Sequence, residues 1–273
     1  MMKINYSEIT NYLTKPPIYE KGNAFMWTDP HIQPFLLEAH INLENDIASR
    51  NKKSIEKTVL WMKSLFMNQS SLDVLDLGCG PGLYIENFYK PNHHIVGIDM
   101  SENSLNYAKK HTKGVTFIQA NYLEIDLNQT FDLIYMIYCD FGVLSIDEQN
   151  QLMHIAKKHL KKGGLFIIDG YNLKFFYHIK AHRSWDMESF GFWSHQPHLV
   201  LNETFIYQEE DAFLEQHIVF EEQQTIPKIY RFYNHIYSLK KMKLLFNHHQ
   251  FSEITCYHHI IDDDTVDFYI FKK

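Results

Sequence analysis

Three glycines at alternate positions follow a short apolar segment directly, and this arrangement restricts the fold more than any other feature of the chain. Residues 73–82 read DVLDLGCGPG, so the acidic residue Asp76 stands two positions before the first glycine. Gly78, Gly80 and Gly82 allow a tight turn and a close approach of the backbone to a bound molecule. We therefore predict a strand, a glycine turn and a helix, with a binding site at the carboxyl edge of a sheet.

Short apolar segments alternate with amphipathic ones over residues 74–170. Strands alternating with helices predict a buried parallel sheet with right-handed crossovers. Two further helices, predicted within residues 32–66, precede the first strand. The predicted strands are residues 74–77, 95–98, 115–118, 131–138 and 165–169, and the predicted helices between them are residues 83–90, 102–111 and 148–160, the last behind an Asp147 cap.

The pattern changes after Gly170. Residues 171–196 are aromatic and irregular, and three segments with interleaved apolar and polar residues follow, which predict antiparallel strands added to the core. A helix and a strand pair close the chain. We predict three parts: residues 1–170 form N-terminal helices and a binding core, residues 171–237 form an antiparallel insertion, and residues 238–273 complete the core. The late strands are predicted at 199–207, 213–221, 229–237, 253–258 and 265–271, with a helix at 238–249.

Composition excludes several classes of protein. Lys and Arg number 26 against 33 Asp and Glu, and the net charge of −7 repels phosphate backbones, so we predict no nucleic-acid partner. The longest central apolar segment, residues 133–139, is far shorter than the ~20 residues of a membrane span, so we expect no membrane association. The N-terminal residues lack the apolar region of a secretory signal. Three widely spaced cysteines point to a reducing compartment, and we expect a cytoplasmic protein whose oligomeric state stays undetermined.

The glycine segment closely resembles motif I of class I S-adenosylmethionine (SAM)-dependent methyltransferases, whose pattern is acidic-x-Gly-x-Gly-x-Gly. A dinucleotide fingerprint would need a third glycine at position 83, where this chain has Leu83. The resemblance extends over about residues 72–170. It implies a Rossmann-like α/β fold, a mostly parallel sheet with helices on both faces, together with the antiparallel β insertion. It also implies SAM as the cofactor and S-adenosylhomocysteine as its product.

Further matches come in the order that the family requires. VGIDMS at residues 96–101 ends the second strand with Asp99, and the resemblance implies that this carboxylate holds the two ribose hydroxyls. FIQANY at residues 117–122 is similar to the motif that meets the adenine, where the amide oxygen of Asn121 accepts in place of the usual carboxylate. Residues 131–142 resemble the fourth strand, and residues 160–169 resemble the turn and the fifth strand that follow it. The implied cofactor site is Asp76, Gly78, Cys79, Gly80, Gly82, Asp99, Met100, Asn121, Tyr122 and Tyr138.

Two charged residues near this motif are further candidates. Arg50 is one of three arginines and precedes the glycine motif by one helix. Because helices placed there in the family often cover the methionine end of the cofactor, we expect Arg50 to bind its carboxylate; a surface ion pair is the alternative. Asp140 follows the fourth strand, where it would act as general base, bind substrate or cap the next segment. His178 and His182 have the spacing of paired metal ligands, but without a persuasive third ligand we predict no metal.

The acceptor site is expected in the insertion. Its aromatic and histidine side chains suit the wall of a small-molecule pocket, although they equally suit an ordinary core. We expect an antiparallel lid over the methyl-donating end of the cofactor, with the acceptor bound by Tyr171, Trp185, Phe192, Trp193 and His195.

We predict methyl transfer from SAM to a nitrogen or oxygen atom of a small molecule, with Asp140 as the first candidate for a base and His195 and Tyr171 as alternatives. Methylation of RNA or protein is a second hypothesis, which the net charge disfavours. A non-catalytic SAM-binding protein that retains the fold is a third.

Overall fold

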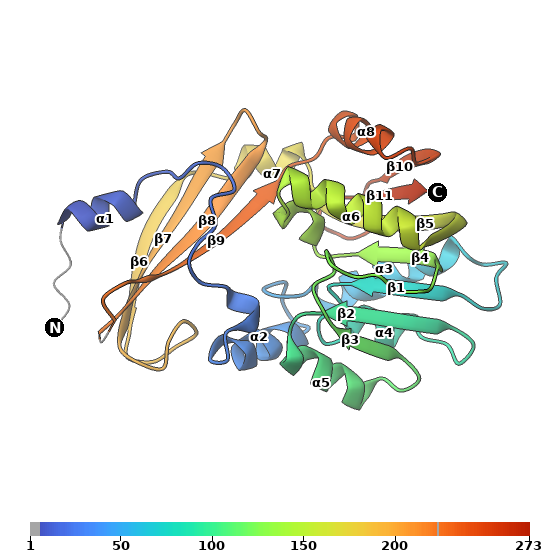
Figure 1. Ribbon diagram of the computed structural model, residues 1–273, viewed down its shortest axis with the longest axis horizontal. Coiled ribbons are helices and arrows are strands. Elements are labelled where there is room, and N and C mark those ends of the chain that lie inside the picture. The colour runs from blue at the N-terminus through green and yellow to red at the C-terminus, as the bar shows by residue number, and fades with distance from the viewer. Residues whose placement is uncertain (1–5, 223) are drawn as a thin grey trace.

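The computed structural model describes residues 6–222 and 224–273 and contains two separate sheets (Figure 1). Residues 1–5, which belong to the segment considered for a secretory signal, and residue 223 of the predicted insertion lie outside the described residues. The larger sheet has seven strands in the order β10-β11-β5-β4-β1-β2-β3. Its strands are β1 (Asp73–Leu77), β2 (His94–Asp99), β3 (Thr116–Gln119), β4 (Phe131–Met136), β5 (Leu160–Tyr171), β10 (Glu253–Tyr257) and β11 (Val266–Lys272).

Strands β1 to β5 run parallel, whereas β11 pairs antiparallel with β5, and β10 antiparallel with β11. Neighbouring residues of β1 enter different cores, since Val74 packs on one face and Leu75 on the other. One face carries α3 (Lys52–Ser64), α4 (Leu83–Phe88) and α5 (Glu102–His111), and the other carries α6 (Ile146–His159) and α8 (Leu239–His248). The predicted Rossmann-like class is confirmed.

The predicted core elements are present, with corrections around α6. The helix begins at Ile146 because Ser145, and not Asp147, caps it: Glu148 N donates to Ser145 Oγ, and Ser145 N donates to the Glu148 carboxylate. It ends at His159, and β5 starts at Leu160, five residues earlier than predicted. The positive φ of Gly163 therefore lies within the first part of β5 and does not terminate the helix.

The four antiparallel strands form a sheet of their own and do not extend the parallel one. They are β6 (His182–Glu188), β7 (His198–Tyr207), β8 (Ala212–Glu221) and β9 (Lys228–His235), paired in sequence order. β6 lies in the part predicted to be irregular, as does the short helix α7 (Leu173–His178). Every residue of β6 is exposed, so the strand has no buried face to impose the alternating pattern on which sequence prediction depends.

The N-terminal segment crosses from one sheet to the other. It contains α1 (Tyr6–Tyr12), the 3-10 turn η1 (Met26–Thr28) and α2 (Ile32–Ile41), and the chain between α1 and η1 runs along β9 (Figure 1). Ala24 N donates to Ile229 O at 3.2 Å, and Ile229 N donates to Asn23 Oδ1 at 2.7 Å. Part of the predicted 1–170 unit is therefore attached to the antiparallel sheet, and the division into three parts stays an interpretation.

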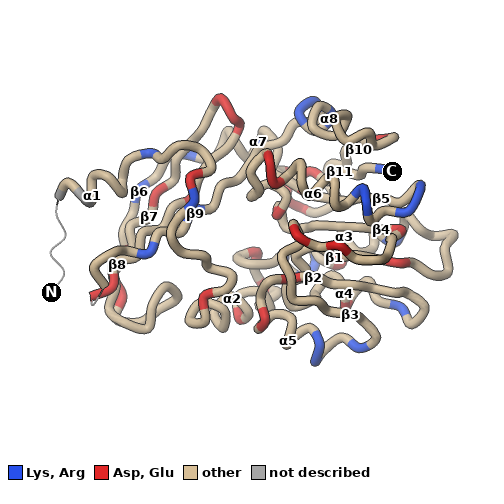
Figure 2. The backbone as a smooth tube through the Cα atoms, viewed as in Figure 1, with Lys and Arg blue, Asp and Glu red and all other residues tan. Residues whose placement is uncertain are grey.

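The distribution of charges and the state of the cysteines add no evidence on where the protein is located. Lys and Arg are interspersed with Asp and Glu along the chain (Figure 2). Among residues 6–222 and 224–273, no helix is both long enough and apolar enough to span a bilayer. Cys79, Cys139 and Cys256 are free thiols. The cytoplasmic location stays a prediction.

Candidate active site

A cavity of about 820 Å³ lies between the carboxyl edge of the parallel sheet and the antiparallel sheet. Its floor comes from the ends of β1, β2 and β4. Its opposite wall comes from residues 231–233 of β9 and from residues 19 and 21–27 of the N-terminal segment. Its size falls in the range of ~300 to 1,000 Å³ that is usual for clefts that bury small ligands.

The glycine turn forms one side of the floor. Gly78 N and Cys79 N both donate to Ile98 O at 2.9 Å, which fastens the turn to β2. Gly78 has a φ of 75°, which favours glycine, and a Cβ on it would lie 3.0 Å from Asp140 Oδ2 and would displace that carboxylate. A Cβ on Gly80 would meet only His40 Cε1, at 4.0 Å, and this glycine is open to the cavity. Gly82 is the residue before α4 and does not line the cavity.

Asp99 joins the glycine turn to the end of β2. Its Oδ2 accepts from Gly80 N at 2.8 Å and its Oδ1 from Ser101 N at 2.7 Å. Burial raises the pKa of Asp99, and the backbone amides of Ser101, Gly80 and Met100 oppose that effect. Each carboxylate oxygen keeps a second lone pair, so the group can accept further hydrogen bonds from a molecule in the cavity. Asp76, Cys79 and Met100 also line the cavity.

The loop after β3 places Asn121 and Tyr122 on the cavity wall. Asn121 Oδ1 accepts from Leu123 N at 3.0 Å, and its Nδ2 donates to Glu124 Oε1 at 3.2 Å. The amide is therefore oriented by its own loop, and its oxygen has one lone pair left for a ligand. Tyr122 is hydrogen-bonded to Asp140, and burial raises the pKa of its phenol well above the ordinary value.

Asp140 begins the 3-10 turn η2 (Asp140–Val143) directly after β4 and lines the cavity beside Gly78. Burial raises its pKa to about 7; the charges of Asp99 and Asp169 act in the same direction, and the Tyr122 hydrogen bond opposes them. A carboxylate with such a pKa can accept a proton near neutral pH. Tyr138, the other candidate from this segment, also lines the cavity.

Arg50 is elsewhere. Its side chain is 8% exposed and does not line the cavity; Nη2 donates to Asp169 Oδ2 at 3.0 Å and lies 3.4 Å from Cys139 Sγ. The ion pair considered as an alternative is therefore present, but it is buried and not at the surface. Contact between Arg50 and a cofactor carboxylate stays a prediction.

The five aromatic and histidine residues expected to bind the acceptor do not line the cavity. Tyr171 stacks on Phe175 with 4.0 Å between ring centroids, and Trp185 is 67% exposed on β6. Phe192 packs against Trp193 at 4.8 Å, and the ring of His195 lies 5.7 Å from that of His31. Tyr171, Phe192 and Trp193 are partly buried against hydrophobic cores, which is the alternative that the sequence left open, whereas Trp185 and His195 are exposed.

Sequence reasoning missed the whole opposite wall of the cavity, which belongs to β9 and the N-terminal segment. Arg231, Phe232 and Tyr233 of β9 line the cavity, as do Tyr19 and Lys21 of the N-terminal segment. No motif identifies them, because they line one cavity only after two segments about 210 residues apart are paired. The one local signal is a glycine at position 22, where a Cβ would lie 2.0 Å from Ile229 O.

This wall combines apolar side chains with charged ones, and the charged ones are paired. Arg231 Nε donates to Gln216 Oε1 at 2.7 Å, and its Nη1 contacts the Glu20 carboxylate. Lys21 Nζ lies 3.2 Å from Glu148 Oε1 and links the N-terminal segment to α6. On the cofactor side, His40 Nδ1 is 2.8 Å from Ser49 Oγ, and burial lowers the pKa of the imidazole to about 4, so the ring is neutral at pH 7.

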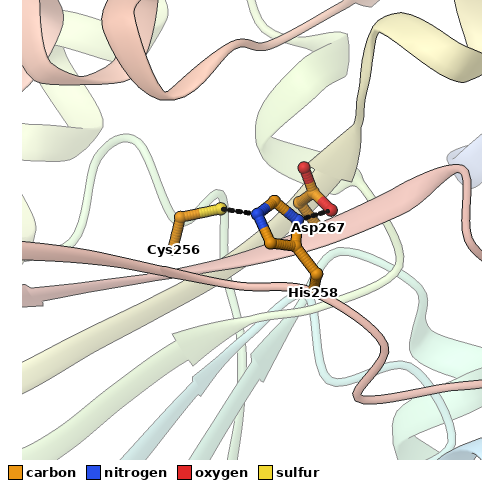
Figure 3. Close-up of side chains that lie close together, drawn as sticks. All are labelled: Cys256, His258 and Asp267. Atoms are coloured by element: carbon orange, nitrogen blue, oxygen red, sulfur yellow. Dashed lines mark hydrogen bonds and ion pairs between the residues drawn. The ribbon is translucent and has the colours of Figure 1, made fainter.

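A separate side-chain cluster lies on β10 and β11 (Figure 3). The His258 ring stands between its partners: Nε2 is 3.9 Å from Cys256 Sγ, and Nδ1 is 2.7 Å from Asp267 Oδ1. One ligand atom from each of the three side chains lies within 4.8 Å of the other two, although Cys256 and Asp267 contact different nitrogens of the ring. The absence of a metal stays a prediction. The His178 and His182 pair is not one helical face either, because α7 ends at His178 and β6 begins at His182.

Comparison with known proteins agrees with this geometry. A family model described as a methyltransferase domain matches residues 68–232, more than half of the chain. The chain belongs to this methyltransferase family. The glycine motif indicated a class I SAM-dependent methyltransferase. The match to the family confirms this expectation and the expected cofactor, SAM.

Individual similarities are more distant. The methyltransferase is 26% identical over 97 residues to the dTDP-3-amino-3,4,6-trideoxy-alpha-D-glucopyranose N,N-dimethyltransferase of Streptomyces venezuelae; the match covers 35% of this chain and 41% of that relative. A SAM-dependent methyltransferase structure from Clostridium acetobutylicum shares the fold with a TM-score of 0.61 at 18% identity, over 88% of this chain and 97% of the other. SAM-bound CalS10, an amino pentose methyltransferase from Micromonospora echinaspora, has a TM-score of 0.57 at 15% identity, over 81% and 92%.

Proposed function

We propose that this protein transfers a methyl group from SAM to a nucleophilic atom of a small molecule bound between the two sheets. The observation that carries the proposal is that one cavity contains the glycine turn, Asp99 and Asp140 on one side and β9 with the N-terminal segment on the other. A donor and an acceptor can therefore meet in the same enclosed space.

The side chains on the floor fit SAM. Gly80 leaves room where a Cβ would project, and Asp99 has free lone pairs for the ribose hydroxyls. Asn121 can accept from the adenine amino group with its remaining lone pair. When bound, SAM supplies a methyl group already activated by its sulfonium. The chain's main task is then to hold the acceptor in line with that methyl, an effect worth ~7 to 11 kcal/mol in favourable systems.

Asp140 is the residue to which we assign proton removal. A hydroxyl or a protonated amine needs a base, whereas a neutral amine needs little help. The pKa of about 7 keeps a useful fraction of this carboxylate ionised at neutral pH. We place a nitrogen acceptor first, because the names of two similar proteins describe an N,N-dimethyltransferase for an amino sugar nucleotide and an amino pentose methyltransferase. An oxygen acceptor is the alternative.

Purified protein incubated with methyl-labelled SAM and a fractionated metabolite extract tests the proposal. We expect label in a small molecule, and we expect Asp140→Asn to reduce transfer while binding SAM as the wild type does. Asp126→Asn, a substitution of an exposed carboxylate paired with Lys158, is the matched control and should leave transfer intact. SAM binding without transfer to any fraction would indicate a non-catalytic SAM-binding protein, and label in RNA or protein would contradict the small-molecule assignment.

A further inference from the structure

Two consecutive residues before Asp140 adopt left-handed backbone conformations. The φ angles are 81° at Tyr138 and 59° at Cys139, and neither residue is glycine, asparagine or aspartate. Each such conformation costs of the order of 1 to 3 kcal/mol and persists only when surrounding contacts impose it. The turn lies between the end of β4 and η2, so its conformation sets the direction in which the chain enters η2 at Asp140.

The contact that imposes this turn comes from β5. Cys139 N donates to Asp169 Oδ1 at 2.7 Å, and Arg50 Nη2 donates to the other carboxylate oxygen at 3.0 Å. Asp169 is fully buried, and the side chain of Arg50 is 8% exposed. A buried charged pair of this kind is costly to desolvate, so its presence beside a strained turn calls for a reason other than stability.

Arg50 and Asp46 make two further contacts with the turn, both of them to Tyr138. Tyr138 lies with its ring centroid 5.3 Å from Arg50 Cζ, and its hydroxyl donates to Asp46 O. Ala48 and Ser49, the residues just before Arg50, line the cavity. The Asp169 carboxylate at the end of β5 therefore connects the turn at 138–139 to the segment 46–50.

We propose that Asp169, together with Arg50, is a positioning residue for Asp140: the pair fixes the left-handed turn at Tyr138 and Cys139 and thereby directs Asp140 into the cavity. This inference rests on the proposed function, in which Asp140 removes a proton from the acceptor. Neither Asp169 nor Arg50 lines the cavity, and both act through the backbone of the turn.

Asp169→Asn is the first test. Asparagine keeps the size of the side chain and can still accept from Cys139 N, but it loses the charge opposite Arg50. Because displacement by about 1 Å can cost ~100-fold in rate, we expect kcat to fall by one to two orders of magnitude while the dissociation constant for SAM stays within about twofold of the wild-type value. If Asp169 had only a structural role, Asp169→Asn would lower the unfolding midpoint, and it would not reduce kcat while leaving the dissociation constant for SAM unchanged.

The ionisation of Asp140 gives a readout that does not need methyl transfer. The groups that face it are Asp99 on β2, Asp169 on β5 and Tyr122 on the loop after β3. Removing the negative charge of Asp169 should lower the pKa of Asp140, and NMR titration of its carboxyl carbon in the SAM-free protein measures that shift. That shift follows from the charge alone, so Arg50→Lys, which keeps both charges, tests the positioning: a change in its Asp140 titration reports a displaced turn. If the wild type bound SAM but transferred no methyl group, the proposed function would fail while the Arg50→Lys titration still tested the positioning.

Glu203→Gln is the matched control. Glu203 is also a buried carboxylate, 2% exposed, and its Oε1 lies 2.8 Å from Nε of Arg183, whose side chain is 64% exposed. It lies in the antiparallel sheet and does not line the cavity. We expect it to lower stability without changing kcat or the Asp140 titration. Should Asp169→Asn fail to fold, Arg50→Lys keeps a cation opposite Asp169 and should show a smaller loss of kcat. Wild-type kcat and an unchanged Asp140 titration in the variants that fold would overturn the inference.

Discussion

Replacing Asp99 with alanine tests the cofactor assignment most directly. In the structure each carboxylate oxygen accepts one backbone amide, from Gly80 at 2.8 Å and from Ser101 at 2.7 Å, and each has a lone pair left for a ribose hydroxyl. A hydrogen bond to a charged group contributes about 1.5 to 3 kcal/mol. Since 1.4 kcal/mol corresponds to a factor of ten in affinity, loss of one such bond should weaken the binding of S-adenosylhomocysteine by ~10- to 150-fold.

Asp99→Ala would also release the Gly80 amide and loosen the glycine turn, so affinity alone does not isolate the ribose contact. Titration calorimetry with a second ligand separates the two effects. The 2′,3′-dideoxy analogue of S-adenosylhomocysteine lacks both hydroxyls, and it should lose much less affinity than the parent ligand when Asp99 is replaced. An equal loss for the two ligands would assign the whole effect to the turn and refute the ribose contact. Unchanged affinity for S-adenosylhomocysteine would remove Asp99 from the site.

Three further outcomes follow from the same geometry. Because Asp140 must be ionised to act as a base and burial raises its pKa to about 7, the rate should rise with pH through about 7, and Asp140→Asn should abolish that limb of the kcat/KM profile; a pH-independent rate from 5 to 9 would remove the base role. Gly97→Ala should destabilise the protein by about 1 to 3 kcal/mol in urea unfolding, since its Cβ would lie 2.8 Å from Ile85 Cδ1, and an unchanged midpoint would contradict this packing. Phe232→Ala should raise the acceptor KM while Trp185→Ala leaves it unchanged, because only the former lines the cavity; the reverse pattern in steady-state assays would restore the β6 side of the sheet as the acceptor site.

The core could be predicted because its signals are local. Residues 73–82 contain the strand, the turn and the start of the helix in one continuous segment, and buried parallel strands appear as short apolar runs. The same reasoning placed Asp99, Asn121 and Asp140, since consecutive parallel strands end at one edge of the sheet. Nine of the ten cofactor residues expected from the motifs line the cavity, and Gly82 is the exception. All ten lie in β1 or β2, or on the loops that follow β1, β2, β3 and β4.

The sequence therefore determined the family, the parallel core and the residues along its edge, because each depends on contacts within a few tens of residues. Tertiary structure alone decided the rest. Arg50 pairs with Asp169, 119 residues away, and the acceptor wall forms where β9 meets residues 19 and 21–27. Aromatic composition drew the prediction toward Trp185 and Trp193, but a residue's type does not tell whether its side chain faces a cavity, a core or solvent. That choice depends on strand register and on the packing of distant segments, where a shift of one residue turns every side chain to the opposite face.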